Sequence, residues 1–289
     1  MTVAFRLGVF GHLASDGLKA RSTRGPPGNA PGSAGNWGLQ DQRESLRWVR
    51  RNIAAFGAPP APPGRASLLC VLRPACSAAP ACDHRARVRV CGGEEWRPFG
   101  CNAGGDPDNV LIFGQSSGGS SVSAHLIMTE SFPLFHKAII ESGSFPSWGT
   151  HSWEAAGRNY NLVIEHEGVQ CGPAAGYRSE AEQLACLLTK DAAAVAAAGG
   201  SVGLPCRDGC GWAPVVDGVE LTDWPIDMVA AGHRALDKPI IQSHCFDDGE
   251  GFAPRRRRTD ARARARQLLP PHYLRATAAR TRWLVEKGS

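Results

Sequence analysis

Residues 114–119 read Gly-Gln-Ser-Ser-Gly-Gly and come directly after a short apolar run, Val110–Phe113. An Ala/Val/Leu pattern at helical spacing follows from Ser120 to Met128. The sequence therefore predicts a strand, a sharp turn and a helix in that order. This is the context in which a G-x-S-x-G segment forms a nucleophile elbow, a turn that presents a reactive serine.

The residue types in this turn have a physical purpose. The elbow forces Ser116 into a strained backbone conformation, and small residues around it let the strand and the helix approach closely. The hydroxyl of Ser116 would then project above the sheet, and the N–H of Ser117 would point at a developing oxyanion. A lone G-x-S-x-G also occurs in loops and helix caps. The neighbouring segments therefore have to show whether this one forms a nucleophile elbow.

Other segments extend this pattern of alternating strands and helices. Val3–Phe5 has the character of a buried strand, and apolar residues recur at helical spacing within Asp41–Phe56. Ala138–Ile140 and Pro239–Ile241 are further short apolar strands. The sequence thus predicts an α/β protein with a parallel sheet that is covered on both faces.

The segment Ala58–Ala103 interrupts this pattern. It is rich in Ala, Pro, Arg, Gly and Cys, has no sustained periodicity, and holds five of the ten cysteines. Its cysteines lack the paired C-x-x-C spacing of zinc sites. We therefore predict a low-complexity insert over 58–103 without a folded element, and no metal site.

The positive charge of the chain is concentrated at its C-terminal end. Residues 253–289 hold ten Arg and one Lys against Asp260 and Glu286, which is +9, so the rest of the chain carries 5 − 9 = −4. An arginine run of this kind is usually solvated, and no aromatic residues interleave with it. We expect a disordered basic tail and no nucleic-acid partner.

The cysteine count and the lengths of the apolar runs indicate whether the protein is secreted or inserted in a membrane. Ten cysteines fit a secreted protein, although their crowding weakens this inference. No run of 18 or more apolar residues and no signal peptide are found, so no membrane span is expected.

Several motifs around the turn resemble the type-B carboxylesterases, the family that includes the cholinesterases. They are Phe5–Gly11, Gly35–Gln42, Leu46–Gly57, Gly105–Asn109 and Leu134–Ser144. The resemblance implies an α/β-hydrolase fold over residues 1–252, interrupted by the 58–103 insert. It also implies an incomplete fold, without its N-terminal strands, its oxyanion loop and its C-terminal third.

The resemblance further assigns roles to single residues. Ser116 is the nucleophile, Ser117 supplies an oxyanion N–H, and Asp248 stands where the family usually has the glutamate of the catalytic triad. Glu250 is the second candidate for that acid, and the context of His272, which follows both, does not resemble that of the triad histidine. The resemblance also implies that Ser142 and Trp148 are supporting residues near the site and that Cys171 and Cys186 form a disulfide. The residues Ser179-x-x-Glu182 predict a capping box for the helix that bears Cys186.

These assignments predict a serine carboxylester hydrolase that works through an acyl-enzyme without a cofactor. Gln115 stands where cholinesterases have a glutamate, so a general carboxylic ester is favoured over a cationic choline ester. Missing machinery would impair this chain. Two alternatives stay open: a non-catalytic adhesion or binding protein on the same fold, and a truncated, mis-spliced product. The resemblance makes the secretory pathway plausible.

Overall fold

The computed structural model describes residues 1–22, 31–56, 105–145, 149–202, 211–235, 237–245 and 248, together with the backbone of 68–71. The chain forms two units, Met1–Ser243 and His244–Ser289, and each is described by itself. All of the helices and strands given below lie in the first unit.

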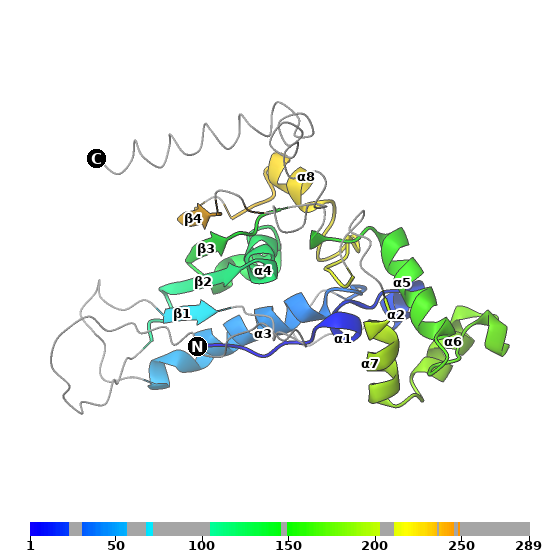
Figure 1. Ribbon diagram of the computed structural model, residues 1–289. Coiled ribbons are helices and arrows are strands. Elements are labelled where there is room, and N and C mark those ends of the chain that lie inside the picture. Colours follow the sequence, from blue (N-terminus) through cyan, green and yellow to red (C-terminus); the bar gives the residue numbers. More distant parts are fainter. Residues whose placement is uncertain are drawn as a thin grey trace, which may run out of the picture. The chain divides into compact units, whose positions relative to one another are not determined.

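A four-stranded parallel sheet forms the middle of the first unit (Figure 1). Its strands, in spatial order, are β1 (Leu68–Val71), β2 (Val110–Gln115), β3 (Lys137–Glu141) and β4 (Ile240–Ser243). Each strand pairs in parallel with the next. The three strands expected near Val110, Ala138 and Pro239 are therefore confirmed, as is the parallel sheet.

The two main helices that cover the sheet are α3 (Trp37–Asn52) and α4 (Ser117–His125). Leu46 and Val49 of α3 and Val122 of α4 pack with Ile112 and Ile140 of the sheet in one buried cluster. The sheet residues share a face because Ile112 pairs with Ala138 and Gly114 pairs with Ile140. This face is the core of the sheet half of the unit.

The opposite face of the sheet is only half-buried at Leu111, Phe113 and Ile139. The expectation of a sheet covered on both faces is thus met on one face alone within the described residues. The helix expected over Asp41–Phe56 is present, but it begins at Trp37, and Ile53–Phe56 forms a 3₁₀ turn, η1.

Two predictions about strands were wrong. Val3–Phe5 forms no strand; the next backbone N–H, that of Arg6, donates to Asp41 Oδ2 at 3.0 Å, so this part of the chain bonds to a side chain of α3. The insert 58–103, expected to have no folded element, contributes β1 through four of its residues. Leu68–Val71 is an apolar run that can pair with the open edge of β2. The expected tail, 253–289, lies outside the described residues.

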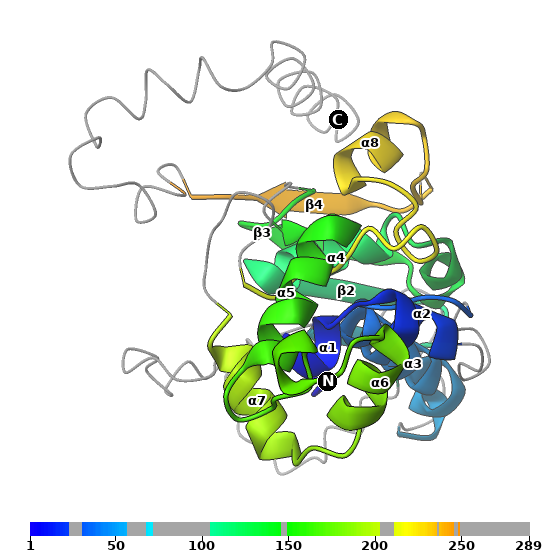
Figure 2. The same cartoon turned by 90° about the vertical axis from the view of Figure 1, so that its right-hand side faces the viewer.

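A second group of helices surrounds its own apolar cluster (Figure 2). It contains α1 (Gly8–His12), α5 (Trp153–Glu165), α6 (Glu180–Leu187) and α7 (Ala192–Gly200). Val9, Val163, Leu187 and Ala198 are buried together there. The shorter elements are α2 (Asp16–Arg21), η2 (Thr129–Leu134), η4 (Pro173–Ala175) and α8 (Pro225–Ala230).

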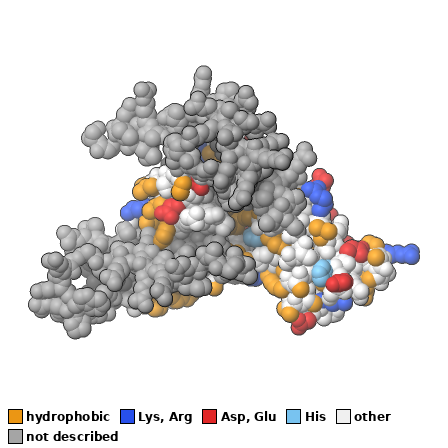
Figure 3. All heavy atoms as spheres, in the orientation of Figure 1, with side chains coloured by type: hydrophobic (Ala, Val, Ile, Leu, Met, Phe, Trp, Pro, Cys, Tyr) orange, Lys and Arg blue, Asp and Glu red, His pale blue; other side chains and the backbone are white. Residues whose placement is uncertain are grey.

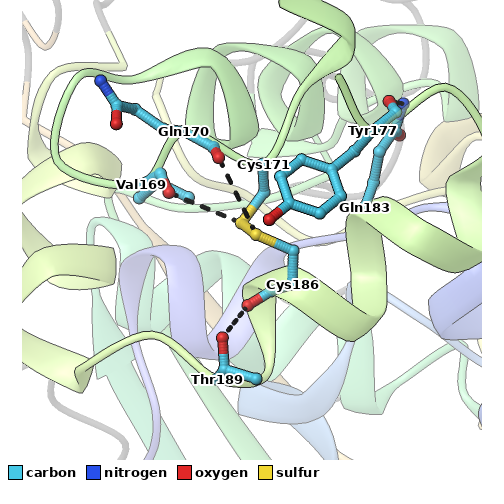
Figure 4. Close-up of a disulfide and its surroundings, with 7 residues drawn as sticks. All are labelled: Val169, Gln170, Cys171, Tyr177, Gln183, Cys186 and Thr189. Carbon is cyan, nitrogen blue, oxygen red and sulfur yellow. Dashed lines mark hydrogen bonds between the residues drawn. A yellow bond between two sulfur atoms is a disulfide. The ribbon is translucent and has the colours of Figure 1, made fainter. Parts of the chain in front are cut away.

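Cys171 and Cys186 form a disulfide that joins the loop after α5 to α6, with a Cα–Cα distance of 5.6 Å. The ring of Tyr177 packs beside it (Figure 4). The hydroxyl of Ser179 accepts from Glu182 N–H and the Glu182 carboxylate accepts from Ser179 N–H, so the expected capping box is present. The disulfide and the box together fix both ends of α6.

Candidate active site

Ser116 lies in the turn between β2 and α4, and its backbone has φ 57° and ψ −122°. A positive φ is uncommon for a residue with a Cβ, and such strain costs on the order of 1–3 kcal/mol. The residue is exposed. The predicted elbow therefore exists as a strained turn at the carboxyl end of a parallel strand, the edge where ligands bind in α/β sheets.

The glycines around the elbow allow its strand and helix to touch at the backbone. A Cβ on Gly114 would lie 2.4 Å from the carbonyl oxygen of Gly118. A Cβ on Gly143, after β3, would lie 2.6 Å from the carbonyl carbon of Gly119. Because no side chain fits at these distances, glycine is needed at both positions.

Backbone hydrogen bonds hold the elbow to the neighbouring strand. The N–H of Ser116 donates to the carbonyl of Glu141 at 2.9 Å, and the carbonyl of Ser116 accepts from the N–H of Ser120 at 2.9 Å. Ser142, one residue further, also has a positive φ, of 46°, and its N–H donates to the carbonyl of Ser243 at 2.8 Å. The carboxyl ends of β2, β3 and β4 are thus joined through two strained serines.

Ser117 is the first residue of α4 and is exposed beside the nucleophile position. The first N–H groups of a helix have no acceptor within the helix, and the helix dipole favours negative charge there. The geometry is compatible with the predicted oxyanion role, which stays a prediction. The side chain of Ser142 is half-buried, and its supporting role also stays a prediction.

A polar network that was not anticipated from the sequence links α3 to α4, and three of its four residues are buried. Gln42 on α3 donates from Nε2 to Ser121 Oγ at 3.3 Å, and its Oε1 lies 3.0 Å from His125 Nε2. The other ring nitrogen of His125, Nδ1, lies 2.9 Å from Ser131 Oγ. Burial, with a smaller effect of the Arg43 charge, lowers the pKa of His125 to about 3, so this histidine is neutral and structural. We call these four residues the Gln42 network.

A small cavity adjoins α4 on the side of the loop that follows β3. Its volume is about 10 Å³, room for about one water molecule, so it cannot hold the acyl group of a substrate. The lining residues are Ser120, Ser123, Ala124, Ser144, Phe145, Gly149, Thr150, Pro214, Leu221 and Pro225.

The remaining residues predicted for the catalytic site lie in the second unit or outside the described residues. Asp248 is exposed in the second unit, where its N–H donates to the carbonyl of Cys245 at 3.2 Å. Trp148, Glu250 and His272 lie outside the described residues. Among the residues that the structure describes, no group of three or more His, Cys, Asp or Glu could hold a metal ion.

The turn of Asp217 is held by hydrogen bonds to both oxygens of a buried carboxylate. Asp217 is 2% exposed, and its Oδ1 accepts from the N–H groups of Val219, Glu220 and Leu221. Its Oδ2 accepts from the hydroxyl of Ser33 at 2.6 Å. One signal could have pointed to this region, because Arg43 falls between Leu39 and Leu46 on the buried stripe of α3 and an arginine there requires an acidic partner.

Over α5, α6 and α7, acidic, basic and apolar side chains are interspersed (Figure 3). None of the helices that the structure describes is long and apolar enough to cross a membrane.

Comparisons with known proteins identify relatives. The sequence model of the group described as "Carboxylesterase family" matches residues 1–62 and 102–278. A cholinesterase of Mus musculus is 30% identical over 255 residues, which cover 87% of this chain and 31% of the relative. An acetylcholinesterase of Leptinotarsa decemlineata is 26% identical over 257 residues, with the same shares of 87% and 31%.

A shorter match and a solved structure agree with these relatives. An acylcarnitine hydrolase of Mus musculus is 32% identical over 143 residues, 50% of this chain and 15% of the relative. The structure of a PNB esterase superposes with a TM-score of 0.55 at 26% identity and covers 87% of this chain and 39% of its own. The chain thus spans about a third of the length of the cholinesterases it matches.

Proposed function

The chain belongs to the carboxylesterase family and has part of an α/β-hydrolase fold, and from this premise we propose that it carries the nucleophile of a serine carboxylester hydrolase. The observation that carries the proposal is the strained backbone of Ser116, with φ 57°, between a parallel strand and the N-terminus of a helix. A fold kept only for binding has no need to retain such strain at a serine.

In the proposed reaction, Ser116 Oγ bonds to the carbonyl carbon of the ester and its proton passes to a general base. The carbonyl oxygen becomes an oxyanion next to the N–H of Ser117. When the carbon–oxygen bond to the alcohol breaks, the alcohol leaves with a proton and an acyl-enzyme remains. Water then releases the carboxylic acid and restores the hydroxyl.

Asp248 is proposed as the acid that orients the general-base histidine. The histidine itself is not assigned to a residue of this chain. His125 does not suit the role, although it lies on α4, because both of its ring nitrogens already have partners and its pKa is lowered to about 3 by burial.

The proposed substrate is a general carboxylic ester. Gln115, next to the nucleophile, is exposed and uncharged, so it gives a cationic alcohol group no ionic partner. Binding of a choline ester would therefore gain nothing from this position.

The test is labelling of the purified chain with a fluorophosphonate, which phosphonylates an activated serine. Labelling should disappear in Ser116→Ala and persist in Ser123→Ala. Ser123 is a buried serine of the same helix that donates to the carbonyl of Gly119 at 3.1 Å. A protein that is folded by circular dichroism but does not label would reject the hydrolase and favour a binding protein on this fold.

A further inference from the structure

The Gln42 network joins α3 to the helix that begins at the nucleophile turn. Gln42 is 1% exposed, and its amide contacts α4 at two points, Ser121 and His125, which are one helical turn apart. In this way one side chain fixes both the distance and the rotation of α4 relative to α3.

The network reaches the first turn of α4 through Ser121. The hydroxyl of Ser121 accepts from Gln42 Nε2 and donates to the carbonyl of Ser117 at 3.0 Å. Ser117 is the residue whose N–H is the proposed oxyanion donor, directly after Ser116. A continuous hydrogen-bonded path therefore runs from α3 to the elbow.

The other half of the network is fully buried. With Gln42 Nε2 donating to Ser121, Gln42 Oε1 accepts from His125 Nε2, and His125 Nδ1 then accepts from the Ser131 hydroxyl. His125 and Ser131 are fully buried, so loss of either contact would leave a buried polar atom without its partner.

We propose that Gln42 is a positioning residue that sets the first turn of α4, and with it Ser116 Oγ and the Ser117 N–H, for attack on the ester. The proposal rests on the hydrolase function proposed above. Displacing a reacting group by about 1 Å can cost about 100-fold in rate, so precise placement of this turn has a measurable effect.

The kinetic experiment is the time course of fluorophosphonate labelling, which separates the inactivation constant kinact from the binding constant KI. Gln42→Leu keeps a similar volume and removes both contacts, and we expect kinact to fall about 10- to 100-fold with KI within about twofold. Ser121→Ala removes the bonds of this hydroxyl to Gln42 and to Ser117, keeps the contact between Gln42 and His125, and should lower kinact about 3- to 10-fold. Gln42→Glu can still accept a hydrogen bond from His125, so its kinact should lie between those of wild type and Gln42→Leu.

The matched control is Ser123→Ala, which removes a hydroxyl-to-carbonyl bond of the same kind from the same helix but has no link to Gln42. Its kinact should stay within about twofold of wild type. A folded Gln42→Leu or Ser121→Ala protein that labels at the wild-type rate overturns the proposal. If Gln42→Leu does not fold, Ser121→Ala and Gln42→Glu decide the question.

A second readout needs no reaction. The N–H of Ser120 donates to the carbonyl of Ser116, so amide hydrogen exchange at Ser120 reports opening of the elbow. We expect this exchange to be about tenfold faster in Gln42→Leu and Ser121→Ala, and unchanged in Ser123→Ala. If the wild-type chain does not label, the hydrolase proposal fails, while unchanged exchange at Ser120 separately rejects the positioning role.

Discussion

Arg43 and Glu220 lie 177 residues apart in the chain and form a two-point ion pair, with Arg43 Nη1 at 2.6 Å from Glu220 Oε2 and Nη2 donating to Oε1. Their side chains are 0% and 3% exposed. The pair joins α3 to the turn of Asp217, and Gln40 adds a bond from Nε2 to Glu220 Oε1 at 3.2 Å. A buried charge must be paired, so each residue requires the other.

Removing one partner of this pair should be costly. Glu220→Leu leaves the Arg43 charge in the core without its carboxylate, and we expect a loss of about 3–5 kcal/mol in the free energy of unfolding. The double variant Arg43→Met/Glu220→Leu should recover most of this loss because no charge remains. Urea denaturation of the three proteins measures both values, and a double variant no more stable than the single one would contradict this account.

The close backbone contact between Gly143 and Gly119 beside the elbow can be tested by adding a Cβ at Gly143. Gly143→Ala places a Cβ 2.6 Å from the carbonyl carbon of Gly119, and we expect a destabilisation of about 1–3 kcal/mol. Gly157→Ala is the control, since a Cβ there meets nothing within 4 Å beyond its chain neighbours and the nearby backbone of its own helix, α5. That variant should gain about 0.5–1 kcal/mol from helix propensity. Equal effects of the two substitutions would show that the backbone contact at Gly143 is unimportant.

The strain at Ser116 predicts that glycine is more stable than alanine at this position. Ser116→Gly and Ser116→Ala both lose the hydroxyl, but only glycine adopts φ 57° without strain. The glycine variant should therefore be about 1 kcal/mol more stable than the alanine variant, because relief of strain exceeds the entropic cost of glycine. Thermal unfolding compares the two, and a more stable alanine variant would argue against strain in the elbow.

Stability should fall as the pH is lowered below about 6.5, the unperturbed pKa of histidine. Burial lowers the pKa of His125 to about 3 and that of His12 to about 4. Between these values and 6.5 the unfolded chain binds protons that the folded chain does not, so each histidine costs up to about 1.4 kcal/mol per pH unit. The effect is absent above pH 6.5.

Urea denaturation measured from pH 7 to pH 4.5 gives the slope of the unfolding free energy against pH. His125→Asn should reduce this slope by the equivalent of about one bound proton, whatever the variant does to stability at pH 7. An unchanged slope in the variant would mean that His125 is protonated in the folded protein.

The disulfide should stabilise the second helical group. Cys171 and Cys186 are 15 residues apart, and closing a loop of this length contributes about 3 kcal/mol. We expect the double variant Cys171→Ser/Cys186→Ser to lose about this much in urea denaturation. The variant should be insensitive to dithiothreitol, whereas wild type should lose stability on reduction; a wild type unaffected by complete reduction would contradict the prediction.

The local features of this protein could be read from its sequence. The turn at Ser116, the helix on each side of the insert and three of the four strands follow from short-range patterns, because a strand or a helix is determined by the spacing of its own apolar residues. The capping box of α6 is likewise contained in four consecutive residues. Family motifs added the pairing of Cys171 with Cys186.

Only the tertiary structure decided which polar residues meet. Arg43 and Glu220 are separated by 177 residues, and Gln42 and Ser121 by 79, so no local pattern connects them. The strand β1 also depends on its neighbour, since Leu68–Val71 extends the sheet only by pairing with β2. The physical reason is the same in each case: a buried charge, amide or strand edge is stabilised only by a partner, and folding of the whole chain determines which partner is near.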